Sequence, residues 1–163
     1  MKEFQISALV KELSPEELSE KDRELVEAAR NATYSAYAPF SGFNVGAAIL
    51  LDNGKIVRGS NQENAAYPSG LCAERTAAFF ASSSNPGVAM RKIAIAARRS
   101  LPPGEDPEKG FLDSPVSPCG SCRQALAEYE HLYRKIEVIL YGKEKIYVLP
   151  SIGSLLPFSF VDF

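Results

Sequence analysis

Cys72-Ala73-Glu74 and, further along the chain, Pro118-Cys119-Gly120-Ser121-Cys122 are the two stretches that decide how this sequence folds. They contain all three cysteines of the protein. An odd number of cysteines at this spacing is typical of a metal site and not of a disulfide framework, although three inert buried thiols are the alternative. Three thiolates can hold one Zn²⁺ and leave its fourth tetrahedral position open, as catalytic zinc sites do. The sequence therefore predicts Cys72, Cys119 and Cys122 as zinc ligands.

Both stretches are predicted to begin helices, whose N-termini favour the thiolate form of cysteine. Three thiolates on Zn²⁺ leave one net negative charge, which a neighbouring cation should offset. Arg75 follows Glu74 and Arg123 follows Cys122. We expect at least one of these arginines to donate hydrogen bonds to the sulfurs, and the alternative for each is an ordinary exposed charge on a helix.

Glu74 is the candidate general acid and base, because it stands two residues after a predicted ligand. The alternative is a helix N-terminal carboxylate that only interacts with the helix dipole. His131 is the only histidine of the chain and is predicted to lie at a helix end or on the surface. No second histidine is present to build a histidine-rich site.

Hydrophobic periodicity and turn residues predict a regular succession of elements along the rest of the chain. Helices are expected at 15–36 (with Ser19 as a second start), 72–81 and 118–131, and strands at 44–51, 55–60, 92–97, 137–141 and 146–149. Only four residues separate the last two strands, too few for a parallel crossover, so these strands should be antiparallel. The order favours a single α/β domain over residues 1–163, with helices on both faces of a mixed five-stranded sheet.

The bulk properties narrow the class of protein. The chain has 163 residues, of which 45% are hydrophobic and 23% are charged, and its net charge is -2. A sequence pI near 5.5 argues against a nucleic-acid-binding protein, which usually has a basic stripe. Residues 1–5 have no apolar signal region, and aliphatic runs such as 45–51 are too short to cross a bilayer. We therefore expect a cytoplasmic protein with no membrane and no nucleic-acid partner.

The chain resembles the cytidine deaminase family in four blocks that stand in the family's order and nearly at its spacing. The blocks are Phe43-Asn44-Val45-Gly46-Ala47-Ala48, Asn61-Gln62-Glu63-Asn64-Ala65-Ala66-Tyr67, Cys72-Ala73-Glu74-Arg75-Thr76-Ala77 and Ser117-Pro118-Cys119-Gly120-Ser121-Cys122-Arg123-Gln124. The resemblance spans roughly Tyr34 to Phe160, which is most of the chain. It implies the three-layer α/β/α fold of that family.

The resemblance also implies the reaction, a zinc-dependent hydrolytic deamination of cytidine and deoxycytidine to uridine and deoxyuridine in pyrimidine salvage. Zinc-bound hydroxide would attack C4, Glu74 would shuttle the proton to ring N3, and ammonia would leave. The substrate contacts implied by the matching positions are Asn61 and Glu63 to the ribose hydroxyls, Phe43 to the pyrimidine, the Ala73 backbone to the base edge and the Ser117 backbone to the amino group. Read without the resemblance, Asn61 and Glu63 could be turn residues and Phe43 could be core.

The first predicted ligand is a cysteine, as it is in the family's homotetrameric branch. The resemblance therefore implies a homotetramer. In that branch a C-terminal aromatic residue reaches the neighbouring subunit's site, and Phe160 fits this position best, with Phe158 second. The alternative is that both residues fill the local core. Two segments depart from the compact family pattern, an N-terminal extension over 1–21 and a long surface loop over 98–114 with mixed charges and several prolines and glycines.

Three other functions compete with this one. A deaminase for the antibiotic blasticidin S would share the cysteine stretches, but Asn61, Glu63 and 65–67 favour a substrate with a ribose. A polynucleotide deaminase is disfavoured by the acidic pI, the absence of tryptophan and the cysteine at the first ligand position. A structural zinc module would need a fourth cysteine or a histidine in register.

Overall fold

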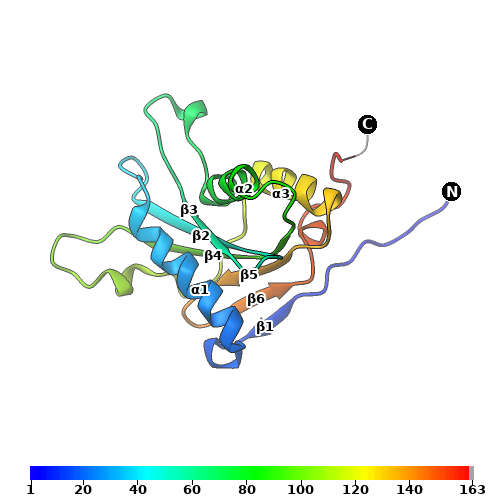
Figure 1. Cartoon of the computed structure of the whole chain (residues 1–163). Helices are drawn as coiled ribbons and strands as arrows, with labels where there is room; N and C mark the ends of the chain where they lie inside the picture. The colour runs from blue at the N-terminus through cyan, green and yellow to red at the C-terminus, as the bar shows by residue number, and fades with distance from the viewer. Residues whose placement is uncertain (162–163) are drawn as a thin grey trace.

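The computed structural model describes residues 1–161, which form a six-stranded mixed sheet with helices on both faces (Figure 1). In chain order the elements are β1 (Lys11–Leu13), η1 (Pro15–Glu17), α1 (Glu20–Ala32), η2 (Thr33–Ser35), β2 (Phe43–Leu51), β3 (Ile56–Ser60), η3 (Tyr67–Ser69), α2 (Ala73–Ser84), β4 (Met90–Arg99), η4 (Pro107–Gly110), α3 (Gly120–Leu132), β5 (Glu137–Tyr141), β6 (Ile146–Leu149) and η5 (Ile152–Ser154). The η elements are short 3-10 turns. The predicted α/β class and its layering are confirmed.

The strands follow the order β1-β6-β5-β4-β2-β3 across the sheet. β4 and β5 are parallel, and every other neighbouring pair is antiparallel, including the predicted pair β5 and β6. The prediction of five strands was wrong, because β1 in the N-terminal extension adds a sixth. Its three residues, Lys11-Glu12-Leu13, carry two charges and no apolar alternation. The free edge of β6, and not the local sequence, determines that this segment is a strand.

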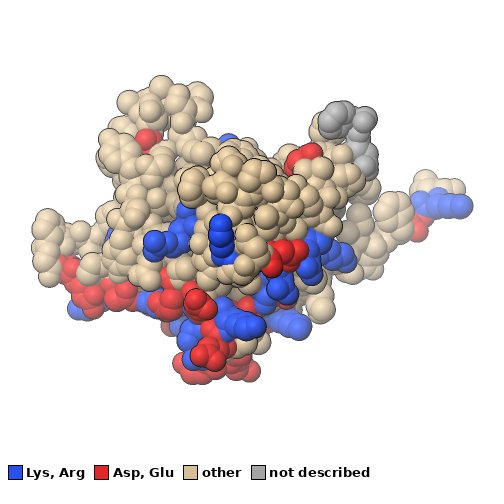
Figure 2. Space-filling model, in the orientation of Figure 1, with Lys and Arg blue, Asp and Glu red and all other residues tan. Residues whose placement is uncertain are grey.

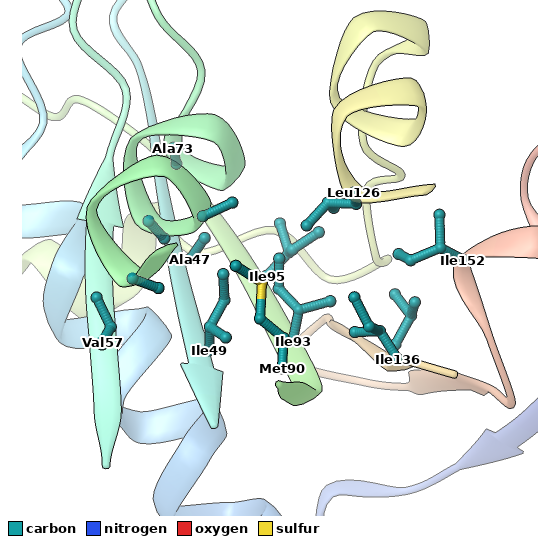
Figure 3. Packing of buried hydrophobic residues seen from close by; sticks show 14 of the residues in the cluster. Ala47, Ile49, Val57, Ala73, Met90, Ile93, Ile95, Leu126, Ile136 and Ile152 are labelled. Carbon is teal, nitrogen blue, oxygen red and sulfur yellow. The ribbon is translucent and has the colours of Figure 1, made fainter. Parts of the chain in front are cut away.

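Two hydrophobic clusters separate the layers, because side chains alternate across a strand. In β4, Ile93 and Ile95 point toward α2 and α3, whereas Ala94 and Ala96 point toward α1. Figure 3 shows the first cluster, in which side chains from the sheet meet Ala73 of α2 and Leu126 of α3.

Two glycines let helices touch the sheet. A Cβ atom on Gly46 of β2 would lie 2.1 Å from the carbonyl oxygen of Ala29 in α1. A Cβ on Gly59 of β3 would lie 2.3 Å from the backbone nitrogen of Ala77 in α2. These distances are too short for any side chain, so both positions require glycine. The contact at Gly59 fixes the height of α2 above the sheet, and therefore the position of its N-terminus.

The first helix begins and ends at other residues than predicted, and its capping residue explains where it begins. The first helix begins at Glu20 and not near Pro15, because the Ser19 hydroxyl accepts a hydrogen bond from the Asp22 backbone N–H at 3.2 Å. Pro15 instead starts η1, in which the Glu17 carboxylate accepts a hydrogen bond from the Ser14 N–H at 2.7 Å. The helix also ends at Ala32 and continues as η2, which is four residues short of the predicted end.

The segment 98–114 is not wholly a surface loop. Arg98 and Arg99 belong to β4, η4 lies within the segment, and Phe111 is only 2% exposed. Among residues 1–161, no helix combines the length and the apolar composition needed to cross a membrane.

Candidate active site

The three cysteines meet where α2 and α3 begin. Cys72 is the N-cap of α2, Cys119 is the N-cap of α3, and Cys122 lies in the first turn of α3. Their Sγ atoms all lie within 4.8 Å of one another, with Cys72 and Cys119 separated by 3.8 Å. Sulfurs bound at about 2.3 Å to a tetrahedral zinc would be about 3.8 Å apart. The donor set therefore fits one Zn²⁺, and it leaves one coordination position for a ligand from solution.

The thiols differ in acidity because of their partners. Hydrogen bonding with Cys122 and with Arg75 lowers the pKa of the Cys72 thiol to about 5, against the effect of burial. Hydrogen bonding to Cys72 and burial raise the pKa of the Cys122 thiol. The surroundings therefore favour the thiolate form at Cys72, and binding a divalent cation would release protons from the ligating thiols.

The two candidate arginines have different partners. Arg75 Nη2 donates to Cys72 Sγ at 3.6 Å, and this contact raises the pKa of the Arg75 guanidinium. Arg123 is directed instead to main-chain oxygens, with Nε donating to the Pro118 carbonyl at 2.8 Å and Nη1 to the Leu155 carbonyl at 2.9 Å. Arg75 is thus the arginine that offsets thiolate charge, and Arg123 joins the start of α3 to the C-terminal segment.

Glu74 is 5% exposed in the first turn of α2 and lines the same cavity as Cys72 and Cys119. Burial raises the pKa of its carboxyl group, and the nearby Cys72 thiolate acts in the same direction. A carboxyl group with a raised pKa is suited to hold a proton and release it again. This burial distinguishes Glu74 from a carboxylate that only interacts with the helix dipole at the surface.

The cavity in front of the sulfurs has an inner and an outer part. The inner part, of about 310 Å³, contains most of the residues predicted to contact substrate. Its lining includes Phe43, Asn61, Glu63, Cys72, Ala73, Glu74, Val116, Ser117 and Cys119. The outer part, of about 580 Å³, shares Ser41, Asn61, Glu63 and Cys72 with it and adds residues such as Phe40, Tyr67 and Arg75. Together they form one cleft that leads from the surface to the cysteines.

Asn61 and Glu63 stand on the chain after β3 and brace the cleft wall. The Asn61 side chain bridges two main-chain groups of β2, accepting from the Val45 N–H at 2.8 Å and donating to the Phe43 carbonyl at 2.9 Å. The Glu63 carboxylate accepts from the Phe40 N–H at 2.9 Å, and hydrogen bonds from Ser41 and Phe40 lower its pKa. Both side chains are therefore fixed in orientation, and Glu63 is ionised at neutral pH.

Phe160, a predicted substrate contact, lines neither part of the cleft. It is 69% exposed, and Phe158 is 83% exposed, so neither fills the core of this chain. Gln124 of α3 holds the backbone of Phe160 on both sides, donating to its carbonyl at 2.6 Å and accepting from its N–H at 3.1 Å. Glu130 of α3 accepts from two N–H groups of η5, at 2.8 and 3.0 Å. The C-terminal segment is thus attached to the helix that carries Cys122.

Two aromatic residues line the outer cleft: Phe40, which sequence reasoning missed, and Tyr67, which it used only as part of the 65–67 pattern. Phe40 and Tyr67 form an edge-to-face pair with ring centroids 6.0 Å apart, and both rings are more than half exposed. Each belongs to a loop with proline and glycine neighbours, Pro39-Phe40-Ser41-Gly42 and Tyr67-Pro68-Ser69-Gly70. An aromatic residue in a polar loop was the available signal, because such a side chain has no core to enter.

Comparison with known proteins gives a consistent set of similarities. A sequence profile described as the cytidine and deoxycytidylate deaminase zinc-binding region matches residues 19–138. The cytidine deaminase of Sporosarcina psychrophila is 42% identical over 105 residues, which cover 64% of this chain and 67% of that protein. The probable cytidine deaminase of Dictyostelium discoideum is 32% identical over 132 residues, which cover 81% and 78%.

Solved structures show the same similarity in three dimensions. The crystal structure of cytidine deaminase from Burkholderia pseudomallei superimposes with a TM-score of 0.70 at 36% identity, covering 88% of this chain and 100% of that one. The cytidine deaminase from Mycobacterium tuberculosis gives a TM-score of 0.65 at 30% identity, covering 87% and 98%. Both the architecture and the overall sequence are thus similar to those of these proteins.

Proposed function

The chain belongs to the cytidine and deoxycytidylate deaminase family, and from this premise we propose that it hydrolyses cytidine and deoxycytidine to uridine and deoxyuridine with release of ammonia. The observation that carries the proposal is the buried carboxylate of Glu74 in the same 310 Å³ cavity as Cys72 and Cys119. A proton carrier and a metal-binding cluster that face one cavity are the two groups that this hydrolysis requires.

Cys72, Cys119 and Cys122 would hold Zn²⁺, whose chemistry when bound is to make a water molecule nucleophilic at neutral pH. Arg75 would support this chemistry, because its guanidinium donates a hydrogen bond to Cys72 Sγ and brings positive charge next to that sulfur. Less negative charge on the sulfurs would make the metal that they hold a stronger Lewis acid.

Glu74 would move the protons. Its carboxylate takes a proton from the attacking water and delivers it to N3 of the pyrimidine, while the water oxygen bonds to C4. A second proton from the same oxygen passes through Glu74 to the exocyclic nitrogen, the C4–N bond breaks, and ammonia leaves. Burial supports this role, because it raises the pKa of the carboxyl group toward the pH at which both steps occur.

The cleft walls support a nucleoside as the substrate. Phe43 offers a ring for the pyrimidine in the inner part, and Ser117 lies on the lining next to Cys119. Asn61 and Glu63 are shared by both parts of the cleft, where a ribose attached to the base would lie. The ionised Glu63 is an acceptor for sugar hydroxyls. Blasticidin S, which lacks a ribose, would not use that acceptor in this way.

Charge in the outer cleft favours a nucleoside over a nucleotide or a polynucleotide. Its lining has one carboxylate, Glu63, and one cation, Arg75, whose Nη2 is already on a sulfur. A phosphate would meet this carboxylate without a free cation to bind it. On the face shown in Figure 2, Lys and Arg are interspersed with Asp and Glu and form no basic stripe.

We also propose that the chain assembles with copies of itself, as the homotetramer expected above. Phe79 and Phe80 on α2 are 44% and 59% exposed, and Phe80 lines a groove of about 480 Å³ against the edge strand β3. Phe158 and Phe160 add a second exposed aromatic pair. Light scattering of the purified protein in solution would measure the number of chains.

The test of the reaction uses zinc-loaded protein and three compounds: cytidine, cytidine 5′-monophosphate and blasticidin S. We expect cytidine to lose its ultraviolet absorbance with release of one ammonia per molecule, and the monophosphate to react at least about tenfold more slowly, the effect of about 1.4 kcal/mol. Comparable rates with the monophosphate would reject the charge argument. Turnover of blasticidin S but not of cytidine would reject the proposed substrate.

A further inference from the structure

The segment from Arg98 to Ser117 joins two walls of the inner cleft. It leaves β4 where Arg99 pairs with Phe43 of β2, and the Arg99 guanidinium lies 6.0 Å from the centroid of the Phe43 ring. It returns at Val116 and Ser117, which line the same cavity. The path between these two points therefore influences where both walls stand.

The near end is tied to the strand that carries Phe43. The Ser100 N–H donates to the Gly42 carbonyl at 2.8 Å. The Asn44 side-chain amide donates to Ser100 Oγ at 2.9 Å. These bonds lie on both sides of Phe43 in the sequence, so the position of Ser100 is coupled to the position of that ring.

The middle of the segment is anchored to α1 and β5. Phe111 is 2% exposed and packs edge-to-face on Tyr141, with ring centroids 6.0 Å apart. The Arg30 guanidinium lies 4.9 Å from the Phe111 ring centroid and 5.3 Å from that of Tyr141. Glu108 accepts hydrogen bonds from Arg30 and, at 2.7 Å, from the Tyr34 hydroxyl. A buried aromatic ring and a bridging carboxylate are features of an ordered anchor and not of a mobile loop.

The far end runs through a narrow passage beside the turn between β5 and β6. The Lys143 N–H donates to the Leu112 carbonyl at 2.9 Å, and Lys143 Nζ pairs with Asp113 at 3.0 Å. A Cβ on Gly142 would lie 2.5 Å from the Asp113 carbonyl oxygen and 2.8 Å from the Pro115 nitrogen. The chain that delivers Val116 and Ser117 to the cavity is thus fixed on both sides.

We propose that residues 98–117 are a brace that sets the distance between the Phe43 wall and the Ser117 wall, with Phe111 and Glu108 as positioning residues that act from outside the cleft. In relation to the proposed function, this brace determines how tightly the pyrimidine is held. The predicted zinc ligands lie at the starts of α2 and α3, whereas Phe111 and Glu108 contact Arg30, Tyr34 and Tyr141, so we expect a change in the anchor to leave zinc content unchanged. Loosening the anchor should weaken binding of the substrate and of the transition state equally, which raises KM and leaves kcat unchanged.

The test compares Phe111→Leu and Glu108→Ala with Glu105→Ala, a matched change in the same segment at an exposed side chain. We expect KM for cytidine to rise about fivefold in Phe111→Leu and about twofold in Glu108→Ala, with kcat within about twofold of the parent and zinc content unchanged. A purely structural role would lower the melting temperature without moving KM. Glu105→Ala should behave as the parent protein in every measurement.

Amide hydrogen exchange gives a second readout that needs no turnover. Peptides covering 40–45 and 112–117 should exchange faster in Phe111→Leu and Glu108→Ala than in Glu105→Ala, because both walls lose their restraint. If the parent protein does not act on cytidine, the proposed function fails and the exchange data alone decide the brace. The proposed brace would be overturned if Phe111→Leu and Glu108→Ala exchanged at the same rate as Glu105→Ala in both wall segments. It would also be overturned if these variants of an active protein kept the parent KM.

Discussion

The starts of α2 and α3 differ from the segment 98–117 in what fixes their structure. At the helix starts, residues within three positions of one another supply the metal ligands and the proton carrier, and each helix begins at a cysteine. In the segment, the contacts that matter join residues 74 and 78 positions apart, as Tyr34 and Arg30 do with Glu108. Each half of the predicted ligand set is therefore local in sequence, although the two halves are 47 residues apart, whereas the shape of the cleft depends throughout on contacts between distant residues.

Cys119→Ser should give the largest effect on zinc binding and activity, because it removes one of the three sulfurs at the helix starts. We expect loss of most bound zinc and a fall in kcat of at least about 10³-fold. Metal analysis and the absorbance assay measure both. Ser121→Ala, an exposed change between the two cysteines of α3, is the control and should keep zinc and activity; equal zinc content in the two variants would contradict the ligand assignment.

Arg75→Ala should give an intermediate effect. It removes the hydrogen bond to Cys72 Sγ, so the sulfurs keep more negative charge and lose part of their orientation. Zinc should dissociate about tenfold faster into a chelator, in line with partners of metal ligands in other proteins. Arg58→Ala, at an exposed position of β3, should release zinc at the parent rate. If both variants released zinc at the same rate, Arg75 would have no role in holding the metal.

Leu13→Ala should give the smallest effect, because β1 is an addition at the sheet edge. Leu13 packs partly buried against the α1-side cluster, and its truncation should cost about 1 kcal/mol of unfolding free energy. Zinc content and kcat should stay at parent values. Lys11→Ala in the same strand is the exposed control. A large loss of activity in Leu13→Ala would show that the N-terminal extension also shapes the cleft.

The sequence was informative where residue type and spacing determine structure. The aliphatic run of β2 predicted a buried strand, and Ser19, the second of two predicted helix starts, is the observed N-cap of α1. The ligand cluster was visible because the chain has only three cysteines, they stand at a distinctive spacing, and a glutamate follows the first of them by two residues. None of these inferences requires knowledge of a distant contact.

The rest depended on partners that the local sequence does not reveal. Lys11-Glu12-Leu13 becomes a strand only because β6 has a free edge. Phe111 is buried although its neighbours are prolines, glycines and charges, because Arg30 and Tyr141 form its pocket. Arg123 donates to the main-chain carbonyls of Pro118 and Leu155 and not to a sulfur. The second contact depends on the path of the chain after β6, which the local sequence does not reveal.

The most direct test of the central claim is the rate of cytidine deamination by Glu74→Gln, measured on protein with its zinc content determined. We expect full zinc content and a kcat reduced by about 10²–10⁴-fold, because the amide cannot carry the protons. Glu24→Gln on the exposed face of α1 should react at the parent rate. Turnover by zinc-loaded Glu74→Gln at the parent rate would contradict the account, because the buried carboxylate would then have no part in the chemistry.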